Sequence, residues 1–95
     1  MPAYIIADIE VSDPARYEEY RKIAPAAIAK HGGRYLARGG QSAVLEGDWR
    51  PGRLVILEFP SLEQAKSFYT SVEYTAARRV RAGAAHMKLV VVEGI

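Results

Sequence analysis

Apolar residues recur with two different periods along this chain, and the order of the two periods restricts the fold more than any other feature. From Ala3 to Val11 an apolar residue stands at every second position, which indicates a strand. From Pro14 to about His31 the apolar residues return at every third or fourth position, which indicates an amphipathic helix. The same two patterns recur further along, so the predicted order is strand, helix, strand, strand, helix, strand.

Residues with special backbone preferences mark the ends of the first helix. Asp13 can cap its first N–H groups, Pro14 suits the first helical position, and Gly32 suits the left-handed cap at its end. Pro25 removes one backbone donor inside the helical pattern. We therefore expect a kink or a break between Arg21 and Pro25.

The second half of the chain contains three more expected strands. The first, from Arg34 to Glu46, is interrupted by a glycine pair that indicates a bulge at Gly39 and Gly40, and a type II turn is expected at Pro51 and Gly52. The other elements are a strand from Arg53 to Phe59, a helix capped by Ser61, a helical stretch from about Glu73 to Ala82 capped by Ser71, and a strand from Met87 to Glu93.

This order of elements predicts one domain over residues 1–95 with the split βαβ arrangement of α+β ferredoxin-like folds. Right-handed crossovers give an antiparallel sheet with strand order 4-1-3-2 and the helices on one face. The side chains expected under the helices are all apolar, and they are Ile5, Ala7, Ile9, Val55, Leu57 and Phe59.

The opposite face of the sheet is expected to carry a second apolar set: Tyr4, Ile6, Leu36, Leu54, Ile56, Val90 and Val92. Soluble monomers rarely expose so large an apolar patch, and no segment of so short a chain is left to cover it. We therefore expect a homodimer in which two sheets pack face to face around a closed or nearly closed barrel. A lipid or another large apolar ligand is the alternative cover.

Charges fall on this same face if the alternation is unbroken: Asp8, Glu58, Arg34, Arg38 and Lys88. If they pair across neighbouring strands or across the dimer, they form a structural network that fixes the register. If they surround a concavity, they form a pocket for an anionic or hydroxylated small molecule.

Composition excludes several classes of protein. The chain has no cysteine, no apolar run long enough to span a bilayer, and a formal net charge of only +2 with both signs interspersed. We therefore expect no nucleic-acid partner, no membrane anchor and a cytoplasmic location. No metal site is expected, because the two histidines, His31 and His86, lie far apart in sequence and have no carboxylate at ligand spacing.

Several motifs in order resemble the bacterial domain of unknown function 1330 family over essentially the whole chain. They are Asp13-Pro14, Gly32-Gly33-Arg34-Tyr35-Leu36-Ala37-Arg38-Gly39-Gly40, Leu45-Glu46-Gly47-Asp48-Trp49, Leu57-Glu58-Phe59-Pro60, Phe68-Tyr69, Glu73-Tyr74 and Val90-Val91-Val92-Glu93-Gly94. The resemblance implies a dimeric α+β barrel of ferredoxin-like protomers and implies no particular activity. The broader structural class includes cofactor-free monooxygenases, muconolactone isomerases and haem-dependent chlorite dismutases, and a shared fold cannot choose among such chemistries.

Individual side chains suggest a site without a cofactor. Arg38, beside the glycine pair, is the expected anion-holding residue, and Glu58 or Asp8 is the matching acid or base. His31, on the inward stripe of its helix, is a further candidate base. The expected substrate-binding aromatics are Trp49, Tyr20 and Tyr69.

Each of these residues also has a structural role to fill. A histidine at a helix end interacts favourably with the helix dipole, an indole in a loop can close the barrel or contact a second subunit, and tyrosines can complete the core. Two functions therefore stay open: a small-molecule-binding protein, with acid–base catalysis as an extension, and a non-catalytic dimerisation module whose charges are structural. Haem binding, a third idea, would need His31 or His86 as an axial ligand.

Overall fold

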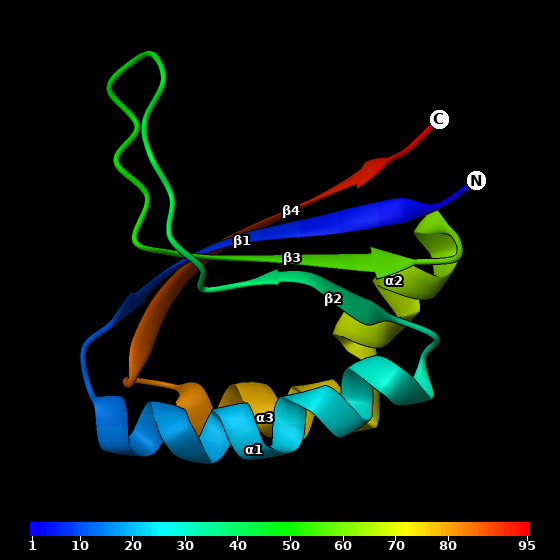
Figure 1. The fold of residues 1–95 in the computed structure, drawn as a ribbon. Coiled ribbons are helices and arrows are strands. Elements are labelled where there is room, and N and C mark those ends of the chain that lie inside the picture. The colour runs from blue at the N-terminus through cyan, green and yellow to red at the C-terminus, as the bar shows by residue number, and fades with distance from the viewer.

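The computed structural model describes all 95 residues, and its element order follows the predicted alternation. Figure 1 shows one sheet with the helices on one side and a long loop rising on the other. The elements are β1 (Ala3–Val11), α1 (Pro14–Lys30), β2 (Arg34–Arg38), β3 (Arg53–Phe59), α2 (Leu62–Thr70), α3 (Val72–Arg81) and β4 (Ala85–Glu93).

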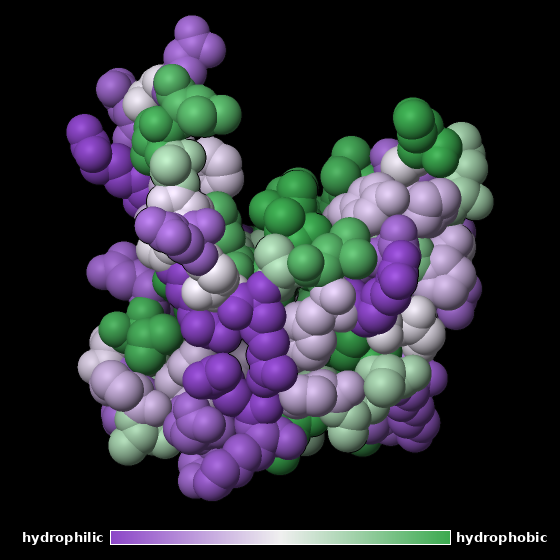
Figure 2. Space-filling view, in the orientation of Figure 1, coloured by the Kyte–Doolittle hydropathy of each residue, from purple (hydrophilic) through white to green (hydrophobic).

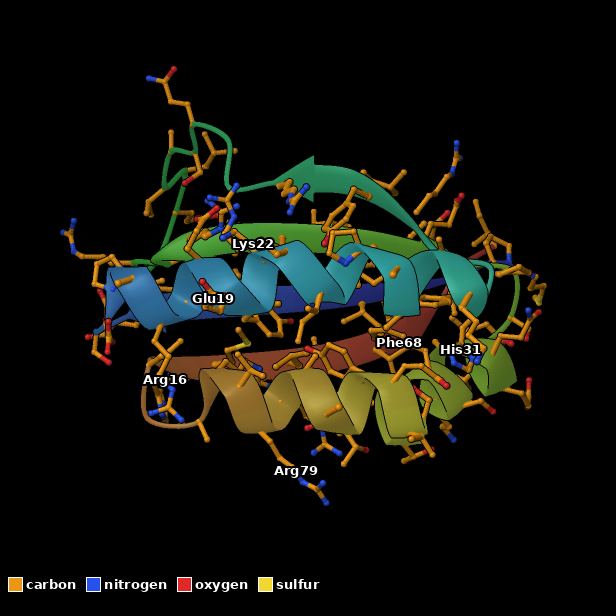
Figure 3. The ribbon with its side chains drawn as sticks, turned by 90° about the horizontal axis from the view of Figure 1, so that it is seen from below. Arg16, Glu19, Lys22, His31, Phe68 and Arg79 are labelled. Atoms are coloured by element: carbon orange, nitrogen blue, oxygen red, sulfur yellow. The ribbon has the colours of Figure 1, made fainter.

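The four strands form one antiparallel sheet in the order β2-β3-β1-β4. This is the predicted order 4-1-3-2 viewed from the other edge, so the predicted ferredoxin-like α+β fold is confirmed. α1 and α3 lie side by side across the sheet in Figure 3, while β2 extends past the flank of α1. None of the helices combines the length and apolarity that crossing a bilayer requires.

The core forms between the helices and the sheet, as the alternation in β1 and β3 predicts. The buried side chains of these two strands all face the helices, and they are Ala3, Ile5, Ala7, Ile9, Val55, Leu57 and Phe59. Phe59 and Phe68 are the largest side chains with almost no exposed surface, and their ring centroids lie 5.0 Å apart. Aromatic pairing therefore anchors α2 to β3.

The helix ends follow the capping residues. The Asp13 carboxylate accepts the Arg16 N–H at the start of α1, and Ser61 and Ser71 cap α2 and α3 in the same way. At the end of α1, Gly32 adopts a φ of 82°, and the N–H of Gly33 donates to the Ile28 carbonyl at 2.9 Å. These bonds form a left-handed cap at the predicted glycine.

Three local predictions are wrong. The break expected between Arg21 and Pro25 does not occur, because α1 is continuous from Pro14 to Lys30. β2 ends at Arg38, because Gly39 takes a φ of 68° and the chain then leaves the sheet, so no strand forms over residues 41–46. The type II turn also fails, because Gly52 lacks the positive φ that this turn requires at its second central residue.

The bulge also occurs earlier than predicted. Tyr35 pairs with Leu57 but Ala37 pairs with Ile56, so Leu36 is an extra residue on β2. One added residue reverses the faces that follow it. Arg38 is therefore opposite Val55, on the helix side of the sheet, and is not on the open face where unbroken alternation placed it.

Candidate functional site

A small cavity lies between the helix side of the sheet and α1. It encloses about 30 Å³, which is room for one or two water molecules. All but three of its lining residues are hydrophobic, and the three exceptions are arginines: Arg21, Arg38 and Arg53. A cavity with an apolar body and a few convergent polar groups is typical of a small-molecule site.

The three arginines come from three different elements. Arg38 is the last residue of β2, and Arg53 is the first residue of β3. Arg53 pairs with Ile9, whose side chain is buried in the core, so it also lies on the helix side. The Nη2 of Arg53 donates to the Arg38 carbonyl at 3.5 Å, which holds the two residues together.

Pro25 contributes to the position of Arg38. In an uninterrupted helix the N–H of residue 25 would donate to the carbonyl of Arg21, but proline has no N–H. The free Arg21 carbonyl accepts a hydrogen bond from Nη2 of Arg38 at 3.4 Å. The residue that was expected to break α1 therefore provides an acceptor for an arginine of the cavity.

The positive charge of this group is only partly neutralised. Glu18 forms the single ion pair in the group, with Arg21 at 3.2 Å, while Arg38 and Arg53 form none. Arg38 instead stacks over the Tyr35 ring, 4.5 Å from its centroid. The Nε atoms of Arg21 and Arg53 are buried and have no acceptor within the protein. Buried donors are normally satisfied, so this group can accept an anionic ligand.

Tyrosine hydroxyls provide the other polar atoms of the cavity. Tyr20 and Tyr74 both line it, and their hydroxyl oxygens lie 2.7 Å apart. One hydroxyl donates to the other, which leaves one proton for a further acceptor. Burial raises the pKa of Tyr17, Tyr20 and Tyr35 above the ordinary value. These phenols stay protonated near neutral pH and act as donors there.

The two predicted strand carboxylates lie on the open face and have other partners. Glu58 accepts a hydrogen bond from Nε of Arg34 at 2.7 Å, across the β2–β3 pair. Asp8 accepts one from the Trp49 indole and one from the Gly52 N–H, each at 2.9 Å. The Trp49 bond, followed by the Gly52 bond, lowers the pKa of Asp8. The predicted cluster of Asp8, Glu58 and Arg38 does not form, because the bulge places Arg38 on the other face.

His31 also lies away from the cavity. It ends α1 next to Phe68, as Figure 3 shows, and its Nε2 lies 3.1 Å from a carboxylate oxygen of Glu73. Lys30 donates to the other oxygen of Glu73 at 2.9 Å. The hydrogen bonds from Lys30 and then His31 hold the pKa of Glu73 at about 2, well below its usual range. This group ties the end of α1 to the start of α3.

The three aromatic residues predicted to bind substrate lie at three different sites. Tyr20 lines the cavity with the arginines. Tyr69 lines a separate apolar groove between α2 and β4, and the Arg78 guanidinium stacks over its ring at 4.4 Å. Trp49 lies on the loop after β2, half-exposed and bonded to Asp8.

Several cavity residues were missed, and some had a signal. Arg53 alternates with Val55 and Leu57, so the pattern already placed it on the helix side. Arg21 lies one helical turn after Tyr17, beside the buried stripe of α1. Tyr35 lies between Arg34 and Leu36, which the alternation placed on the open face, so the pattern had also placed Tyr35 on the helix side, where it pairs with Leu57.

The fold of this chain is similar to those of several solved structures. A protein of unknown function from Rhodopseudomonas palustris is 18% identical with a TM-score of 0.74, over 99% of this chain and 82% of that one. A dimeric ferredoxin-like protein of unknown function from Thermobifida fusca is 16% identical with a TM-score of 0.67, over 99% and 92%. SnoaB, a cofactor-independent oxygenase from Streptomyces nogalater, is 9% identical with a TM-score of 0.67, over 99% and 93%.

The fold and the cavity together define a ferredoxin-like protein with a basic helix–sheet cavity. A family model, described as a domain of unknown function, DUF1330, matches residues 2–95. The chain belongs to that family, as its motifs predicted. A search of curated proteins finds no match, and the structural likenesses, all of low identity, establish the fold alone.

Proposed function

We propose that this protein binds a small organic anion in the helix–sheet cavity, with its charged group on Arg38, Arg21 and Arg53. The observation that carries this proposal is the convergence of three guanidinium groups with a single carboxylate partner on an otherwise hydrophobic cavity. Guanidinium groups present paired donors that match a carboxylate.

The cavity also restricts the rest of the ligand. Its enclosed volume of about 30 Å³ admits little more than water, so a larger ligand must displace the long arginine side chains. The lining beyond the arginines suits an apolar or aromatic body. The Tyr20–Tyr74 hydroxyl pair can donate to an acceptor on that body.

Binding is better supported than acid–base catalysis. No carboxylate or histidine lines the cavity, and the proposed acid–base residues Glu58, Asp8 and His31 lie elsewhere. The pairs Glu58–Arg34 and Asp8–Trp49 favour the second function, a dimerisation module, for the open face. The two functions are compatible, because they use opposite faces of the sheet.

Thermal unfolding with three anion probes, acetate, benzoate and inorganic phosphate, tests the binding site. A ligand that binds the native state raises the melting temperature, and the shift grows with the ratio of the ligand concentration to the dissociation constant. We expect millimolar benzoate to stabilise the protein and neutral benzamide to have no effect. Arg38→Ala should lower the affinity for benzoate about tenfold or more.

Arg79→Ala is the matched control, because it removes the same charge. Arg79 is exposed on α3, and Figure 3 shows its side chain projecting from the side of α3 that faces away from α1. We expect this variant to bind benzoate as the parent does. Equal effects of the two arginine substitutions, or no stabilisation by any of the three anions, would refute the proposed site.

For the open face we propose homodimerisation through the sheet. Ile6 forms a central apolar row with Ile56 on β3 and Val90 on β4. Val90 is 58% exposed and Val92 is 49% exposed, which is costly in water. The ferredoxin-like protein from Thermobifida fusca is described as dimeric. Sedimentation equilibrium should show a dimer that Val90→Glu dissociates, and a monomeric parent protein would refute the proposal.

A further inference from the structure

The loop between β2 and β3 is an arm, defined here as residues 39–52. Figure 1 shows that it rises from the sheet on the side opposite the helices. Residues 41–50 are all exposed, and no residue from Gly40 to Asp48 makes a hydrogen bond with the rest of the chain. The arm therefore has almost no support from its own protomer beyond its base.

The arm nevertheless carries exposed large apolar side chains. Val44 is 46% exposed, Leu45 is 96% exposed and Trp49 is 58% exposed. Figure 2 shows hydrophobic residues on the side of the arm that faces the open sheet, and again on the floor of the hollow beside it. A projecting segment with apolar side chains and no internal contacts is typical of a surface that another molecule covers.

The base of the arm is fixed to the open face. Trp49 and Gly52 both bond to Asp8, which lies on the open side of β1. A second, polar hollow of about 570 Å³ lies between the base of the arm and the strands β1 and β4, and it contains both signs of charge: Asp8, Glu10, Asp48, Arg50, His86 and Lys88. An interface between identical copies must be self-complementary, and a surface with both signs of charge allows opposite charges to meet across a two-fold axis.

We propose that the arm packs against a second copy of this chain, with Leu45 as its main apolar contact. This inference rests on the proposed homodimer, because the arm projects on the side where that partner lies. Two-fold symmetry then gives each dimer two arms, one from each protomer. The arms extend an interface whose sheet portion has one wholly apolar cross-strand row, Ala37–Ile56–Ile6–Val90.

The test compares two aspartate substitutions on the arm by sedimentation equilibrium over a dilution series. Leu45→Asp places a charge at the proposed contact, and we expect it to raise the dimer dissociation constant about tenfold or more. Ser42→Asp adds the same charge at another exposed position of the arm and should leave the constant near that of the parent. Circular dichroism verifies that both variants fold.

The outcomes separate this inference from the homodimer itself. A monomeric parent protein overturns both. A dimer that Val90→Glu dissociates and Leu45→Asp does not overturns the arm contact alone, and the apolar tip then faces something other than a second copy. Selective loss of the dimer in Leu45→Asp supports the arm contact.

Discussion

The Trp49 indole Nε1 donates a 2.9 Å hydrogen bond to one oxygen of Asp8, and the other oxygen accepts the Gly52 N–H at 2.9 Å. One carboxylate on β1 thus holds a side chain of the arm and the residue at which the arm ends. Because both bonds favour the charged form, they lower the pKa of Asp8.

Asp8→Ala should release the arm while leaving the sheet intact. Without an acceptor, Trp49 becomes more solvated, and we expect its fluorescence emission to shift to longer wavelength. Amide hydrogen exchange over residues 39–52 should accelerate. Glu10→Ala is the control, because Glu10 is an exposed acid on the same strand and makes no side-chain hydrogen bond. Identical spectra and exchange in the two variants would show that Asp8 does not restrain the arm.

Glu73 predicts an acid-sensitive contact between α1 and α3. Its pKa in the folded protein, about 2, lies below the ordinary value of 4.5. A depressed pKa contributes stability that is complete above the ordinary value and is lost as the pH falls toward the folded value. The free energy of unfolding should therefore decrease from about pH 4.5 to pH 2.

Glu73→Gln should make that decrease shallower, because the variant has no carboxylate to protonate. Urea denaturation at a series of pH values measures the slope. Glu63→Gln, at an exposed position on α2, should keep the slope of the parent. If both variants follow the parent curve, then the Lys30 and His31 contacts with Glu73 contribute nothing to stability.

The Tyr20–Tyr74 hydroxyl pair predicts non-additive substitutions. Tyr20 is 8% exposed and Tyr74 is 3% exposed, so either single change to phenylalanine leaves a buried hydroxyl without its partner. Each should cost about 1–2 kcal/mol of unfolding free energy. The double variant removes both hydroxyls and should cost less than the sum. Chemical denaturation of the four proteins measures the coupling, and strictly additive costs would contradict the pair.

Two glycines of the arm should respond differently to substitution by alanine. A Cβ at Gly52 would lie 2.5 Å from the Ile9 carbonyl oxygen, which is backbone and cannot move aside easily. Gly52→Ala should therefore destabilise the protein by about 1–3 kcal/mol. Gly40 has no atom within 4 Å of such a Cβ and no positive φ, so Gly40→Ala should be neutral within about 0.5 kcal/mol. Similar unfolding curves for both variants would contradict this difference.

The fold was predictable because the spacing of the apolar residues in each segment fits only one kind of secondary structure with one buried face. The row Ile5, Ala7 and Ile9 is buried only if every second residue of β1 faces the helices. Capping residues such as Asp13 and Gly32 then mark helix ends through local bonds that need no tertiary contact. Strand order follows from the handedness of the crossovers.

The site was predictable only in part, because it depends on one inserted residue. Arg34, Leu36 and Arg38 fit an unbroken alternation equally well, and nothing in their polarity reveals that Leu36 is an added residue in the ladder. The bulge separates Arg38 from Glu58 and brings it to Arg21, Arg53 and Tyr20. The sequence predicted Arg38 and Tyr20 as separate candidate residues. Their proximity in one cavity depends on how β2 pairs with β3, which the sequence pattern does not show.

Pro25 leaves the Arg21 carbonyl free to accept a hydrogen bond from Arg38, so its substitution should affect both α1 and the cavity. In Pro25→Ala the new N–H can donate to the Arg21 carbonyl, which completes the ladder of α1 and competes with Arg38 for that acceptor. Restoring the helical bond stabilises the helix, while the loss of proline gives the unfolded chain more freedom. We expect a net gain of roughly 1–2 kcal/mol in unfolding free energy.

Binding should change in the opposite direction. Arg38 without the Arg21 carbonyl is less ordered, so the affinity for benzoate should fall while stability rises. Pro14→Ala is the matched control, since Pro14 lies at the start of α1, where its missing N–H leaves no carbonyl free. A Pro25→Ala protein that matches the Pro14→Ala protein in both stability and benzoate affinity would show that the Arg21 carbonyl does not position Arg38.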